Sequence, residues 1–120
     1  MLRPLCFALA LAALPAAAQE PVIQKVLASQ SDDGTWRFDV TILHPDEGWT
    51  HYADGWRILD MDGNELGMRV LYHPHVDEQP FTRSLPGVEV PEGTTQVQVQ
   101  ARDNPGGWNS GTTVVTLPGS

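Results

Sequence analysis

Cysteine is nearly absent from this chain of 120 residues, which has one, Cys6. The rest of the chain therefore has no thiol for a disulfide, for thiolate metal ligation or for a cysteine nucleophile. Basic residues are also scarce: seven Lys and Arg stand against fifteen Asp and Glu, giving a net charge of −8. Phosphate backbones and anionic lipid surfaces repel such a chain, and it has no basic stripe, so nucleic acid is not an expected partner.

Long hydrophobic runs are missing except at the start. Arg3 precedes an apolar run over residues 5–14, and small residues follow at positions 16–18, which is typical of a secretory signal peptide. The run is too short to span a bilayer and no later segment is longer, so we expect no membrane insertion after cleavage. We expect a signal peptide over residues 1–18, removed together with Cys6, and one periplasmic or secreted domain over residues 19–120.

A hydrophobic period of two dominates the rest of the chain and predicts β-strands. Over residues 35–43 and 96–102 apolar and polar residues alternate, and residues 111–117 form a third clear strand. Residues 55–72 predict a hairpin that turns at Asp62-Gly63-Asn64, and residues 21–31 predict a first strand. Residues 81–90 offer one or two short strands broken at Pro86-Gly87. No segment keeps helical spacing, so we predict an all-β fold, a single antiparallel sandwich of about seven strands.

The segment "LPGVEVPEGTTQVQVQARDNPGGWNSGTTVVTL" covers the last third of the chain and resembles the closing strands of immunoglobulin-like and fibronectin type III-like domains. Trp36 and Trp56 would suit the core tryptophans of such domains, whereas the usual tyrosine of the penultimate strand is replaced by Val97 or Val99. The resemblance implies an immunoglobulin-like sandwich and says little about activity, because this architecture carries many functions.

The four histidines form the first candidate site. His73 and His75 are two residues apart, so an extended chain would present both rings on one side. His44 and His51 flank the preceding loop, and the predicted hairpin would bring them to the same end of the sandwich. Imidazoles suit copper and zinc, so we predict a copper or zinc site formed by His44, His51, His73 and His75, with Asp77, Glu78 and Tyr52 as supplementary groups. Alternatively, His73 and His75 are surface residues that hydrogen-bond Asp77 or Glu78.

Two tryptophans form a second candidate site of another class. Trp49 and Trp108 lie in predicted loops, where an indole can stack on a sugar ring or anchor a partner protein. Neighbouring polar residues would supply hydrogen bonds: Asp46, Glu47, Asp54 and Asn109. This pattern predicts contact with a glycan or an envelope protein; the alternative is that each indole caps one end of the sandwich.

Catalysis finds little support in the sequence. No nucleophile-elbow pattern surrounds a serine, and the adjacent acids Asp32-Asp33, Asp46-Glu47 and Asp77-Glu78 would point apart in an extended chain, as in solvated turns. The "DMDGNE" segment resembles a calcium loop, but its glycine comes too early and a hairpin turn explains it better. We therefore expect a monomeric binding module and not an enzyme.

Overall fold

The computed structural model describes residues 20–119, so the expected signal peptide and Cys6 lie outside the described residues. The described part is all β and contains no helix that could cross a membrane. Its strands are β1 (Val22–Gln30), β2 (Trp36–Leu43), β3 (Tyr52–Leu59), β4 (Glu65–Val70), β5 (Phe81–Val88), β6 (Gln96–Asn104), β7 (Gly107–Trp108) and β8 (Thr113–Thr116).

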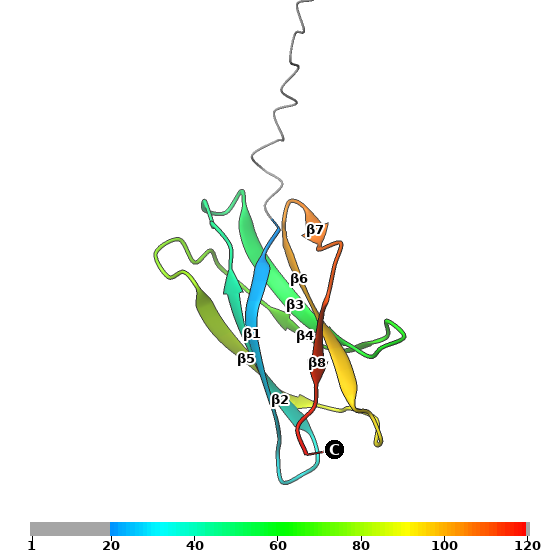
Figure 1. The fold of residues 1–120 in the computed structure, drawn as a ribbon. Coiled ribbons are helices and arrows are strands. Elements are labelled where there is room, and N and C mark those ends of the chain that lie inside the picture. The colour runs from blue at the N-terminus through cyan, green and yellow to red at the C-terminus, as the bar shows by residue number, and fades with distance from the viewer. Residues whose placement is uncertain (1–19, 120) are drawn as a thin grey trace, which may run out of the picture.

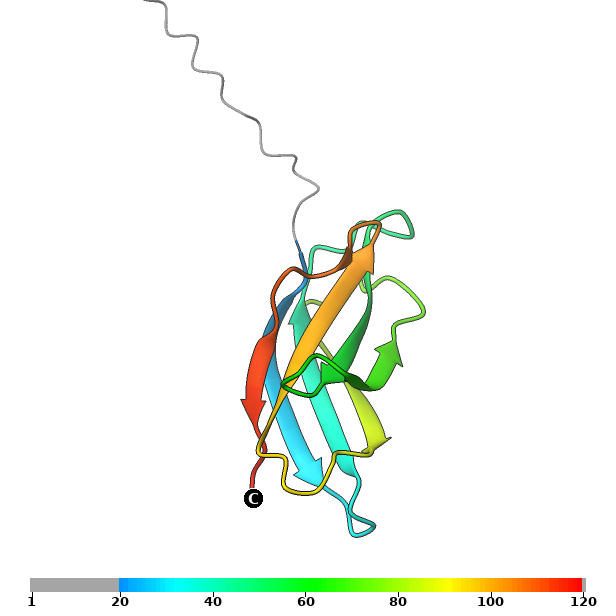
Figure 2. The ribbon, with the colours of Figure 1, turned by 90° about the vertical axis from the view of Figure 1, so that its right-hand side faces the viewer.

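The strands form two layers, as the sequence pattern predicts (Figures 1 and 2). One sheet has the order β1-β2-β5, and the other has the order β4-β3-β6-β7 with β8 also paired to β6. Every pairing is antiparallel. The predicted all-β sandwich is confirmed.

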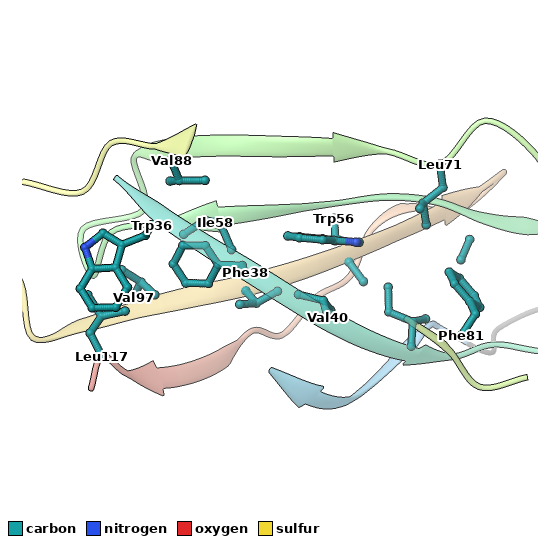
Figure 3. Packing of buried hydrophobic residues seen from close by; sticks show 14 residues of the cluster. Trp36, Phe38, Val40, Trp56, Ile58, Leu71, Phe81, Val88, Val97 and Leu117 are labelled. Carbon is teal, nitrogen blue, oxygen red and sulfur yellow. The ribbon is translucent and has the colours of Figure 1, made fainter. Parts of the chain in front are cut away.

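The core lies between the two sheets because alternate residues of each strand face inward (Figure 3). Phe38, Val40 and Ile42 of β2 are fully buried, and so are Trp56 and Ile58 of β3. Val97, Val99 and Ala101 of β6 complete the middle of the core. Trp36 and Leu117 lie at one end of the core, and Leu71 and Phe81 lie at the other. The inward positions expected for both core tryptophans are confirmed.

Turns follow the predicted chemistry with one exception. The β3–β4 hairpin turns at Asp62-Gly63-Asn64, and the Asp60 carboxylate accepts hydrogen bonds from the backbone N–H groups of Asp62 and Asn64. The expected break at Pro86-Gly87 is wrong, because β5 runs through both residues to Val88. β5 is an edge strand, where a proline need not donate to a neighbour, and its register against β2 shifts at this point.

Three loops gather at one end of the sandwich, the upper end in Figure 1. They connect β2 to β3, β4 to β5, and β6 to β7. The C-terminal end of the described chain and the β1–β2 turn lie at the opposite end. All four histidines belong to the first two of these loops.

Candidate metal centre

Three inward-facing polar residues continue the core at this end. His44 lies two residues beyond the buried Ile42 and is itself 0% exposed. Asp103 extends the inward series of β6 past Ala101, and only 5% of it is exposed. His51 comes directly before β3 and is 7% exposed, in a tight loop that is closed by a bridge to Gly48. The alternation that buries the apolar side chains therefore carries these polar side chains inside as well.

The three side chains meet around one carboxylate oxygen. Asp103 Oδ2 lies 3.0 Å from His51 Nε2 and 3.3 Å from His44 Nε2. The two imidazole rings stand edge to face with centroids 4.7 Å apart. One ligand atom from each residue lies within 4.8 Å of the others, so these three residues could hold a metal ion.

Asp46 holds this cluster from behind. Its Oδ1 lies 2.5 Å from His44 Nδ1 and accepts the Ala53 N–H at 2.9 Å. Its Oδ2 accepts the His75 N–H at 2.7 Å. The contact with Asp46 fixes the His44 ring through Nδ1 and leaves Nε2 on the side of Asp103, which is the arrangement in which a carboxylate orients a metal-binding histidine.

Gly106 makes room for Asp103. A Cβ atom at position 106 would lie 2.5 Å from Asp103 Oδ1, closer than real Cβ contacts allow. On the other side of the cluster, Glu47 Oε2 lies 3.9 Å from His51 Nδ1, and 69% of the Glu47 side chain is exposed. Gly106 thus leaves the space that Asp103 occupies, whereas Glu47 makes only a long contact from an exposed position.

His73 and His75 form a separate pair. Their ring centroids are 4.6 Å apart, and His75 also stacks on Phe81 at 4.0 Å. His75 is buried, and no atom of residues 20–119 forms a hydrogen bond with either of its ring nitrogens. Burial lowers the pKa of His75, and the nearby Arg83 guanidinium lowers it further, so the ring is neutral at neutral pH. His73 is exposed and its Nδ1 donates to the Pro74 carbonyl at 3.1 Å.

The predicted site therefore divides into two parts. The structure brings His44 and His51 together and brings His73 and His75 together, but the group close enough to share one ion has Asp103 in place of the second pair. Asp46 links the two pairs through the His44 ring and the His75 backbone.

The predicted supplementary groups lie outside the cluster. Asp77 and Glu78 are exposed, and Glu78 forms an ion pair with Arg83 at 2.9 Å. The Arg83 hydrogen bond holds the pKa of Glu78 below its usual value. Tyr52 is half-buried, and its ring stands edge-on to Trp49 with centroids 5.7 Å apart.

The two predicted loop tryptophans differ. Trp49 lies in the β2–β3 loop and is 66% exposed, so contact with a glycan or an envelope protein through it stays a prediction. The placement of Trp108 in a loop is wrong: it belongs to β7, is half-buried, and pairs with Arg102 of β6. The Arg57 guanidinium lies 3.9 Å from the centre of its ring and that of Arg102 lies 5.0 Å away. These guanidinium groups cover the indole.

Sequence reasoning missed the two buried acids. The sequence predicts a solvated turn for Asp46 and Glu47, which is wrong for Asp46, since only 6% of it is exposed. The signal for Asp103 was the alternation itself, because one more step after Val97, Val99 and Ala101 places an aspartate on the inward side. A charged residue at an inward strand position is rare without a partner, so it marks a site.

Comparison with known proteins gives one informative similarity. The chain is 45% identical over 78 residues to a protein of Halomicrobium mukohataei named "Putative lipoprotein". The matched region is 65% of this chain but 38% of the relative, so the chain spans little more than a third of that protein. No family model matches the chain, and no solved structure matches it.

Proposed function

We propose that this protein is an exported binding module that holds one divalent copper or zinc ion on His44, His51 and Asp103. The observation that carries the proposal is the buried convergence of one ligand atom each from His44, His51 and Asp103 within 4.8 Å of one another. Charged and polar side chains that are buried this close together need hydrogen bonds or ion pairs with one another, or a bound ion. The carboxylate of Asp46 behind His44 adds the support that metal-binding imidazoles usually have.

The donor set determines which ions fit. Two imidazoles and one carboxylate, without sulfur, suit Zn²⁺ and Cu²⁺ better than Cu⁺. The same set also occurs with Fe²⁺, but ligands of this kind bind Fe²⁺ more weakly than Cu²⁺ or Zn²⁺. Three protein ligands leave a coordination position open, which a water or an exchanging ligand can occupy. The role included in this proposal is to carry or buffer the ion.

The location and the type of sandwich belong to the same proposal. The signal-peptide pattern over residues 1–18 and the name of the Halomicrobium protein both support export, to the periplasm or the outside of the cell. We also propose that the two-sheet domain is immunoglobulin-like and acts as a monomer. The alternating strands of the last third of the chain support the first of these points.

Calorimetry with Cu²⁺ and Zn²⁺ tests the ion site against the competing interpretation, a hydrogen-bonded network that only joins the loops. The titrations compare the wild-type protein with His51→Ala and Asp103→Asn. The matched control is Asp77→Asn, which makes the same chemical change as Asp103→Asn in an exposed carboxylate at the same end of the molecule. We expect Cu²⁺ to bind more tightly than Zn²⁺, and each of the two site variants to lose at least about tenfold in affinity, as loss of a ligand or its support does.

The ion must also stabilise the fold. Free ion at a hundred times its dissociation constant should raise the free energy of unfolding of the wild-type protein by about 2.7 kcal/mol. Unchanged affinity in both His51→Ala and Asp103→Asn, with circular dichroism showing folded proteins, would overturn the proposal.

A further inference from the structure

The imidazole of His75 lies in a position that a buried polar group rarely occupies. Its side chain is 3% exposed, yet no atom of residues 20–119 satisfies either ring nitrogen. A buried polar atom without a partner costs about 1–3 kcal/mol, so such groups in native proteins usually contact a water or a ligand. One face of the ring packs on Phe81, with an angle of 12° between the two rings. The nitrogens at the ring edge remain as the groups to be satisfied.

The exposed ring of His73 supplies a second ligand nitrogen beside His75. Its Nδ1 donates to the Pro74 carbonyl, which leaves Nε2 as the acceptor nitrogen. Two imidazoles bound to one ion with metal–nitrogen distances of about 2.0–2.1 Å have ring centroids about 4.5 Å apart at the right angle of square-planar copper and about 5.2 Å apart at the tetrahedral angle of zinc. The centroids of His73 and His75 are 4.6 Å apart, which fits the right-angle arrangement.

The surrounding charges tolerate a cation at this point. Asp46 Oδ2 lies 3.9 Å from His75 Nδ1 and brings a buried negative charge close to the ring. Arg83 is the nearby positive charge, and its ion pair with Glu78 at 2.9 Å offsets it. The net charge of −8 also concentrates cations near the surface.

We propose that His73 and His75 form a second site for a divalent copper or zinc ion, distinct from the site on His44, His51 and Asp103. Asp46 lies between the two sites, with one carboxylate oxygen on the His44 ring and the other on the His75 backbone. The second site has fewer protein ligands, so it binds its ion more weakly than the first. The protein then carries two ions of different affinity at one end of the sandwich.

Stoichiometry tests this inference separately from the proposed function. Each protein is dialysed against excess Cu²⁺ or Zn²⁺, and the bound metal is counted by elemental analysis. We expect two ions on the wild-type protein, one on His73→Ala, and one on the double variant His51→Ala/Asp103→Asn. His75→Phe keeps an aromatic ring against Phe81 while it removes both nitrogens, and we expect one ion on it as well.

Nuclear magnetic resonance of the imidazole nitrogens during a Zn²⁺ titration identifies the ligands directly. We expect the His44 and His51 nitrogens to shift with the first equivalent and those of His73 and His75 with the second. One ion on both the wild-type protein and His73→Ala, with the His51 variant empty, would overturn the second site and leave the proposed function standing. Two ions retained on the His51→Ala/Asp103→Asn variant would instead overturn the proposed function.

Discussion

Replacing Asp46 by asparagine tests whether one buried carboxylate organises this end of the protein. Asp46 accepts the N–H groups of Ala53 and His75 and contacts His44 Nδ1. An amide keeps the size of the side chain but has only one acceptor oxygen. Whichever way the amide turns, its NH₂ group must face a donor, and at least one buried N–H loses its acceptor.

The magnitude follows from these contacts. If the amide oxygen stays on the Ala53 and His44 side, the His75 N–H is left unpaired at a cost of about 1–3 kcal/mol. For a domain of this size, such a loss lowers the melting temperature by about 5–20 °C. Urea denaturation followed by tryptophan fluorescence, with a chelator present, measures the stability without a bound ion. Because His44 also loses the negative charge behind its ring, we expect copper affinity to fall about ten- to a hundredfold.

Glu47→Gln provides the matched control. Glu47 is adjacent in sequence, but 69% of its side chain is exposed, so the same chemical change should alter stability by no more than about 0.5 kcal/mol. Asp46→Asn and Glu47→Gln proteins of equal stability and equal ion affinity would refute the central role of Asp46.

Two further predictions concern close contacts elsewhere. Gly106→Ala should displace Asp103 and weaken ion binding by about tenfold in calorimetry. The control is Gly111→Ala, whose Cβ meets nothing within 4 Å and which should not change the affinity. Equal affinities of the two variants would contradict the steric explanation. The Ser84 hydroxyl donates to Asp39 and holds the pKa of that carboxyl below its usual value. This hydrogen bond therefore stabilises the fold at neutral pH, and the stabilisation is lost as the pH falls below about 4 and through the folded-state pKa of Asp39. Ser84→Ala should lower the free energy of unfolding by about 1 kcal/mol at pH 7 and by much less near pH 2. Urea denaturation at the two pH values checks this, and a difference independent of pH would contradict it.

Most of the sandwich could be predicted because each strand buries one face. The alternation around Phe38 and around Val99 follows directly from that geometry, and the turn at Gly63 follows from backbone freedom. The path of β5 could not be predicted, because Pro86 is tolerated only at a sheet edge and the order of strands is a tertiary property. The two-residue β7 likewise depends on its pairing with β6 and has no local signal.

The sequence predicts that histidines form the candidate site and that the site lies at one end of the sandwich, but it does not predict which side chains share the ion. The histidines and the expected export indicate the loops at that end, where His44 and His51 do meet. Asp103 joins them only because β6 pairs with β3. It contacts His51, which lies 52 residues earlier in the sequence. Adjacent acids such as Asp46 and Glu47 look alike in sequence, and which of them turns inward depends on the loop that the whole fold imposes.

The links through Asp46 and Gln79 have a consequence for the motion of the loops. The His44 N–H donates to Gln79 Oε1, and the Gln79 amide donates to the His75 carbonyl. Side chains inside the protein therefore accept the hydrogen bonds of three backbone N–H groups that do not donate to a neighbouring strand. These are the N–H groups of His44, Ala53 and His75. Amides held in this way exchange with deuterium only when the loops open together, so both loops should behave as one cooperative unit with strand-like protection.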